Sequence, residues 1–135
     1  MRQEGDKSVS FSFPKSERLC SRLQLEQLLA QKQSVFAYPY KCYYQVLPRS
    51  AENEVSKMAV AVPKKLEKTA VGRNRIKRWT RESYRLNKND FLALLPENQV
   101  LNLLFVCIGK DEISYASVCK AMSQVFQLIL QKLND

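Results

Sequence analysis

In the run Arg73-Asn74-Arg75-Ile76-Lys77-Arg78-Trp79-Thr80-Arg81-Glu82, basic residues and residues able to pack in a core recur with the period of an α-helix. This pattern is the strongest indication of the fold. At roughly 100° per residue, one face collects residues able to pack on a sheet: Ile76, Trp79, Thr80, Ser83 and Tyr84. The opposite face collects Asn74, Lys77, Arg78, Arg81, Arg85 and Lys88, with Arg73 and Arg75 on the two flanks. We predict an amphipathic helix over residues 73–88 with its cations facing solvent.

Positive charge is concentrated in and around this helix. Residues 64–88 hold ten basic and two acidic side chains, and so about eight of the nine formal positive charges of the chain. Only Glu82 opposes the cations inside the helix, whereas like charges repel at helical spacing. Such clusters bind polyanions, because they release the counterions condensed on phosphates. The pattern therefore favours a polyanion-binding surface over a merely solvated face.

Charge alone leaves the class of polyanion open. A membrane-surface helix fits poorly, because the face opposite the cations is half polar. Duplex DNA admits a basic helix into its major groove, while folded RNA suits one broad cationic face. Both nucleic acids remain possible at this point.

The composition predicts a binding protein rather than a self-sufficient enzyme. The chain has 135 residues, no histidine and only three glycines, which excludes the commonest general base, a P-loop and a dinucleotide-binding loop. The acidic residues form no evident catalytic or metal-binding cluster, so we expect no catalytic residue and no metal site.

The four cysteines are widely spaced, so we expect them to be reduced thiols. With no signal peptide and no apolar run long enough to cross a bilayer, a cytoplasmic protein is expected.

The remaining elements follow from hydrophobic periodicity. Residues 1–12 are expected to form a flexible arm, and residues 13–135 a single domain. We predict a helix over residues 16–32 capped by Ser16, strand character over 34–47 interrupted at Pro39, and a buried strand over 57–62. The latter two segments are expected to pair as an antiparallel hairpin. A strand over 100–108 and a helix capped by Ser114 complete an α-β-β-β-α-β-α order, an α+β sandwich on one four-stranded sheet.

At the basic helix the sequence resembles the protein subunit of bacterial ribonuclease P. The family signature is an Arg-Asn-Arg stretch opening its second helix, and residues 73–82 reproduce it closely. Upstream, Val60-Ala61-Val62-Pro63-Lys64-Lys65 fits the family's strand ending in a lysine pair. The segment Lys15-x-x-Arg18-Leu19 fits its start, and the resemblance extends over about residues 13–132.

The resemblance implies a fold and a function. The fold would be similar to the second domain of ribosomal protein S5, with a left-handed β-α-β crossover through the basic helix. The protein would bind the catalytic RNA of ribonuclease P and the 5′ leader of precursor tRNA, with no DNA or membrane partner. The RNA would hold the magnesium ions and cleave the leader, and the protein alone would bind no cofactor.

The resemblance also assigns site residues. The RNA-binding set would be Arg73, Asn74, Arg75, Lys77, Arg78 and Arg81, with Lys64 and Lys65 beside them. Leu25, Leu29 and Tyr43 would line the leader cleft, although family members often have phenylalanine in place of the two leucines. Core packing is the other interpretation of Leu25 and Leu29. Strand alternation places Tyr43 on the face opposite Tyr40 and Tyr44.

Two other function classes stay open. A general RNA-binding or ribosome-associated module would bind RNA without a catalytic role. A protein-only nuclease is disfavoured, because the sequence shows no evident metal-binding carboxylate cluster.

Overall fold

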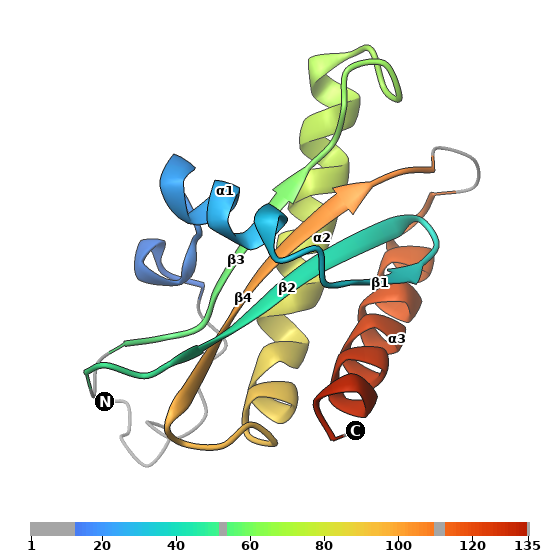
Figure 1. The fold of residues 1–135 in the computed structure, drawn as a ribbon. Coiled ribbons are helices and arrows are strands. Elements are labelled where there is room, and N and C mark those ends of the chain that lie inside the picture. Colours follow the sequence, from blue (N-terminus) through green and yellow to red (C-terminus); the bar gives the residue numbers. More distant parts are fainter. Residues whose placement is uncertain (1–12, 52–53, 110–112, 135) are drawn as a thin grey trace, which may run out of the picture.

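A four-stranded sheet forms the centre of the molecule and separates its helices into two layers (Figure 1). The computed structural model describes residues 13–51, 54–109 and 113–134, so the predicted arm at residues 1–12 lies outside the described residues. The strands are β1 (Ser34–Ala37), β2 (Tyr40–Pro48), β3 (Lys57–Ala61) and β4 (Gln99–Cys107). The helices are the 3-10 turn η2 (Lys15–Glu17), α1 (Arg22–Ala30), α2 (Ala70–Leu92) and α3 (Tyr115–Leu133).

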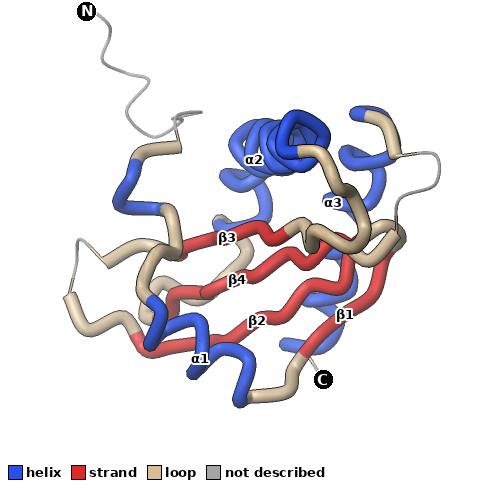
Figure 2. Tube along the Cα trace, turned by 90° about the horizontal axis from the view of Figure 1, so that it is seen from above, coloured by secondary structure: helices blue, strands red, loops and turns tan. Residues whose placement is uncertain are grey.

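Viewed along the sheet, α2 and α3 cover one face and α1 covers part of the other (Figure 2). The larger core lies under α2 and α3 and includes Leu101, Leu103 and Phe105, alternate residues of β4. Phe105 is buried there with its ring 5.4 Å from that of Tyr40, and Phe91 of α2 stacks on Phe126 of α3 at 4.1 Å. The smaller core, under α1, contains the buried residues Leu19, Leu28 and Leu104. The predicted α+β sandwich is confirmed.

The strand order is β1-β2-β4-β3, with β3 parallel to β4 and the other pairs antiparallel. In Figure 1, β3 and β4 both point upward, β4 lies to the right of β3, and α2 passes behind them. The β3–α2–β4 crossover is therefore left-handed, as the resemblance implied. Almost all such connections are right-handed, so the general rule would have given the opposite hand.

The predicted antiparallel hairpin between residues 34–47 and 57–62 is wrong. β2 forms its hairpin with β1, across the turn at Tyr38 and Pro39, and its other edge pairs with β4 over nine residues. β4 is buried on both faces, which is typical of a strand in the centre of a sheet covered on both sides. β4 therefore lies between β2 and β3, and β3 pairs with the edge of β4 that faces away from β2.

The predicted first helix is shorter than residues 16–32, and its cap is Ser21 rather than Ser16. The Ser21 side chain accepts a hydrogen bond from the amide of Gln24 at 3.2 Å. Upstream, the Leu19 amide donates to the carbonyl of Met58 in β3 at 2.9 Å. Because β3 is an edge strand with unpaired backbone groups, it holds the chain extended here and delays the helix.

The other sequence predictions need smaller changes. The basic helix is longer at both ends than the predicted residues 73–88, because α2 spans Ala70–Leu92. Ser114 caps α3 in a capping box with Ser117, as predicted for its cap. All four cysteines are free: Cys42 and Cys107 are buried, Cys119 is half-buried and Cys20 is exposed. No helix among the described residues is long and apolar enough to span a membrane.

Candidate nucleic-acid interface

The start of α2 is fixed by a capping arrangement. The Thr69 hydroxyl accepts a hydrogen bond from the Gly72 amide at 3.0 Å, which satisfies one of the free amides of the first turn. The Glu67 carboxylate in turn accepts from the Thr69 hydroxyl at 2.8 Å and from its amide at 3.2 Å. These hydrogen bonds hold the pKa of Glu67 below its usual range.

Arg73 connects the preceding loop to α2. Its guanidinium donates to the carbonyl oxygens of Glu67 at 3.0 Å and Lys68 at 2.9 Å. The loop is thereby held against the first turn of the helix. Lys64 and Lys65, both exposed, lie in this loop just after β3. The lysine pair thus belongs to the loop that Arg73 holds against the start of α2.

The inner face of α2 consists of the residues predicted for it. Ile76, Thr80, Ser83 and Tyr84 are buried, and Trp79 is half-buried. The Thr80 hydroxyl donates to the Ile76 carbonyl at 2.8 Å and is also hydrogen-bonded to the hydroxyl of Tyr40 in β2. These contacts fix the rotation of the helix on the sheet, and so determine which residues face outward.

The outer face carries cations with few partners. Asn74, Arg75, Arg78 and Arg81 are exposed, and Arg73 and Lys77 are half-buried. Within the described part of the chain, the ion pairs of α2 are those of Arg85 with Glu82, at 2.6 Å, and of Lys88 with Glu17. The predicted RNA-binding cations therefore form no ion pair with described residues. A surface of this kind retains its charge for an external anion.

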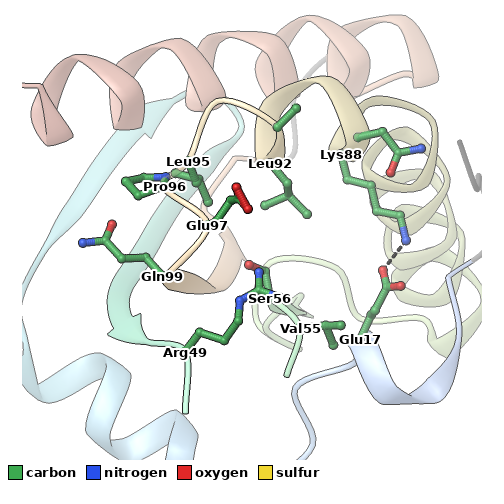
Figure 3. Close-up of a pocket in the computed structure, with 12 residues that line it drawn as sticks. Glu17, Arg49, Val55, Ser56, Lys88, Leu92, Leu95, Pro96, Glu97 and Gln99 are labelled. Atoms are coloured by element: carbon green, nitrogen blue, oxygen red, sulfur yellow. Dashed lines mark hydrogen bonds and ion pairs between the residues drawn. The ribbon is translucent and has the colours of Figure 1, made fainter. Parts of the chain in front are cut away.

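The placement of Lys88 on the outer face is wrong. Its side chain is only 4% exposed and forms an ion pair with Glu17 of η2, at the edge of a pocket near the end of α2 (Figure 3). Its ammonium also lies 5.8 Å from the ring centroid of Phe13, which packs edge-on against Tyr84. Phe13 and Glu17 therefore cover α2 around Tyr84 and Lys88, and the helical period alone could not show this.

The opposite face of the sheet contains the residues predicted for a cleft. Leu25 and Tyr43 are half-buried and pack in the cluster under α1. Leu29 is 42% exposed and lies outside that cluster. The structure therefore brings together two of the three predicted residues. Beside them, β3 contributes Ala59 and Ala61 to the same cluster.

Sequence analysis assigned no site role to two further cations. The Lys41 ammonium lies 5.2 Å from the ring centroid of Tyr43, so it adds positive charge to the α1 side of the sheet. The alternation that placed Tyr43 there also placed Lys41 there, and so could have revealed it. Arg18 is the second. It lies far from α2 in sequence but lines a hollow beside Arg78 and Arg81, and no local pattern signals this.

Comparisons with known proteins agree with this geometry. The family model for ribonuclease P matches residues 13–131. The ribonuclease P protein component of Porphyromonas gingivalis is 34% identical over 118 residues, covering 85% of this chain and 84% of that protein. That of Vibrio cholerae is 43% identical over 65 residues, 48% of each chain.

Solved structures show the same fold. The RNase P protein of Staphylococcus aureus has a TM-score of 0.63 at 20% identity, and the match covers 85% of this chain and 96% of that one. The RNase P protein of Thermotoga maritima has a TM-score of 0.57 at 21% identity, covering 83% and 96%. Because the family model spans nearly all of the described residues and a curated relative matches along most of its length, this chain belongs to the ribonuclease P protein family.

Proposed function

We propose that this chain binds the catalytic RNA of ribonuclease P through the outer face of α2 and assists endonucleolytic removal of the 5′ leader from precursor tRNA. The observation that carries the proposal is the arrangement of α2, whose inner side is buried on the sheet and whose outer side gathers Arg75, Arg78 and Arg81, none of them ion-paired with a described residue. Arg73, Asn74, Arg75, Lys77, Arg78 and Arg81 would contact RNA phosphates, together with Lys64 and Lys65. Arginine suits this role because its planar fork matches phosphate oxygens.

The chemical step is proposed to belong to the RNA. The magnesium ions would be held by RNA phosphates and would activate the attacking water, while the protein supplies binding and orientation. The chain has no histidine to act as general base. Its cations instead offset the repulsion between two polyanions, the catalytic RNA and its substrate. The complex is proposed to work in the cytoplasm.

The leader is proposed to lie on the α1 side of the sheet. Tyr43 offers a half-buried ring on which a base can stack, Leu25 an apolar wall, and Lys41 a charge for a neighbouring phosphate. Leu29 stands apart from this cluster and would contact only a leader that extends along α1. Since leucine replaces phenylalanine at two positions, Tyr43 would supply most of the stacking.

Reconstitution of precursor-tRNA cleavage tests the proposal. The catalytic RNA and its precursor tRNA are mixed at low magnesium, with and without the full chain, and initial cleavage rates are measured. The chain should raise the rate, and Arg78→Ala should require more protein for the same effect. Lys132→Ala is the control, because this lysine is exposed in the last turn of α3, which belongs to neither proposed RNA-contacting surface. An unchanged rate on adding the wild-type chain would refute the assignment.

The same assay distinguishes the proposed function from the alternative function. A general RNA-binding or ribosome-associated module would bind the catalytic RNA in a salt-dependent manner but leave leader cleavage unchanged. Measuring binding and cleavage on the same samples therefore distinguishes a subunit of the enzyme from a protein that only coats RNA.

A further inference from the structure

A hollow between the N-terminal segment and α2 gathers four arginines. Phe13 and Arg18 form one wall, and Arg78, Arg81, Arg85 and Glu82 of α2 form the other. Glu82 is engaged by Arg85, through contacts of 2.6 and 3.1 Å between its carboxylate and the guanidinium. Neither Arg78 nor Arg81 forms an ion pair with a described residue. The hollow is therefore cationic, and its single acid is already occupied.

Arg18 is held in place rather than loosely attached. Its guanidinium donates to the Phe13 carbonyl at 3.2 Å and lies 5.4 Å from the centroid of the Phe13 ring. The neighbouring residues fix the backbone on both sides. Leu19 is hydrogen-bonded to Met58 of β3, and Glu17 forms the ion pair with Lys88 of α2 (Figure 3). An arginine ordered before binding loses less conformational entropy when it meets a ligand.

We propose that this hollow, the arginine pocket, binds one backbone phosphate of RNA, with Arg18, Arg78 and Arg81 as its ligands. The proposal rests on the proposed RNA-binding function and adds to it a residue from outside α2. A phosphodiester presents two unesterified oxygens and one negative charge, which suit convergent guanidinium groups. Because Arg78 and Arg81 also belong to the outer face of α2, the pocket continues that face towards the N-terminal segment.

A double-mutant cycle on binding of the full chain tests this directly. Affinity is measured for wild type, Arg18→Ala, Arg81→Ala and the double variant. Two probes are used: the catalytic RNA alone, and precursor tRNA added to the complex of the chain with that RNA. Each single change should weaken binding about tenfold, since it removes a hydrogen bond between charged groups. If both arginines contact one phosphate, the double variant should lose clearly less than the product of the two single losses.

The matched cycle pairs Arg18→Ala with Arg75→Ala. Arg75 lies on the flank of α2 with its guanidinium 5.8 Å from the Trp79 ring centroid, and it does not line the pocket. The losses in this cycle should multiply. Lys132→Ala, which removes the same charge from α3, measures the effect of net charge alone. Thermal denaturation checks that the variants fold, and Arg18→Lys replaces Arg18→Ala in the cycle if the alanine variant does not.

The outcomes separate the two proposals. Coupling between Arg18 and Arg81 with either probe supports the pocket, and the probe that shows it identifies which RNA supplies the phosphate. Independent losses with both probes overturn the pocket. Failure of the proposed function has another signature, because the wild-type chain would then leave leader cleavage unchanged whatever the cycle shows.

Discussion

Removing Lys88 while keeping Glu17 is the sharpest test of how the N-terminal segment is attached to α2. Lys88→Met preserves the length and most of the volume of the side chain but removes its charge. The Lys88 side chain is 4% exposed and that of Glu17 19%, so the pair is mostly shielded from water. Glu17 would be left as a poorly hydrated carboxylate without its ammonium partner.

The magnitude follows from this burial. Removing one partner of a buried ion pair costs about 3–5 kcal/mol, because the remaining charge is uncompensated. Glu17 keeps some contact with water, so the lower end applies, and we expect the free energy of unfolding to fall by about 3 kcal/mol. For a domain of this size that corresponds to a fall in Tm of roughly 10 °C.

Urea denaturation of the full chain, followed by circular dichroism, measures the effect. The double variant Glu17→Gln/Lys88→Met should recover most of the loss, because it leaves no unpaired charge. Arg22→Met, in the exposed pair with Glu26, is the control and should leave stability unchanged. If Lys88→Met were no more destabilising than Arg22→Met, the ion pair would not hold the segment, and the reasoning would be refuted.

Three further predictions address the cleft, the helix cap and the core. Tyr43→Ala should weaken binding of leader-containing precursor tRNA to the reconstituted enzyme by about 1–3 kcal/mol per stacked base, but should leave a leaderless tRNA unaffected. Tyr43→Phe, which keeps the ring, should behave as wild type. The pKa of Glu67 is lowered by its hydrogen bonds to Thr69, so its contribution to stability is present above about pH 4.3, the usual pKa in the unfolded chain, and is lost as the pH falls through the lower folded value. Glu67→Gln should therefore flatten the acid limb of a stability–pH profile, and an unchanged limb would contradict the cap. Phe105→Ala should cost about 3–5 kcal/mol in urea denaturation, because the ring is fully buried, whereas Leu23→Ala, at an exposed position, should have little effect.

The basic helix shows which structural features a local sequence pattern can predict. Ile76, Thr80 and Tyr84 recur at helical spacing, and burying them on the sheet turns the cations outward, as predicted. The capping role of Ser114 could also be predicted from the sequence, because helix caps depend on residues close in sequence. The α+β class followed from the order of such local elements.

The pairing of the strands could not be predicted from local sequence patterns. The expected hairpin between residues 34–47 and 57–62 assumed that neighbours in sequence pair in space. In the structure, β4 competes for the same edge of β2 and takes it, because burial of its apolar faces outweighs a short connection. The left-handed crossover came from family resemblance, and general chirality rules pointed the other way.

Sequence periodicity thus predicted most of the residues that α2 buries and exposes, and with them its cationic outer face, because the spacing of side chains along a helix is local. Tertiary structure decided where that surface ends. It turned Lys88 inward to Glu17, and it brought Arg18 beside Arg78 and Arg81. These contacts join segments some sixty to seventy residues apart, and their formation depends on a docking of chain segments that no local repeat encodes.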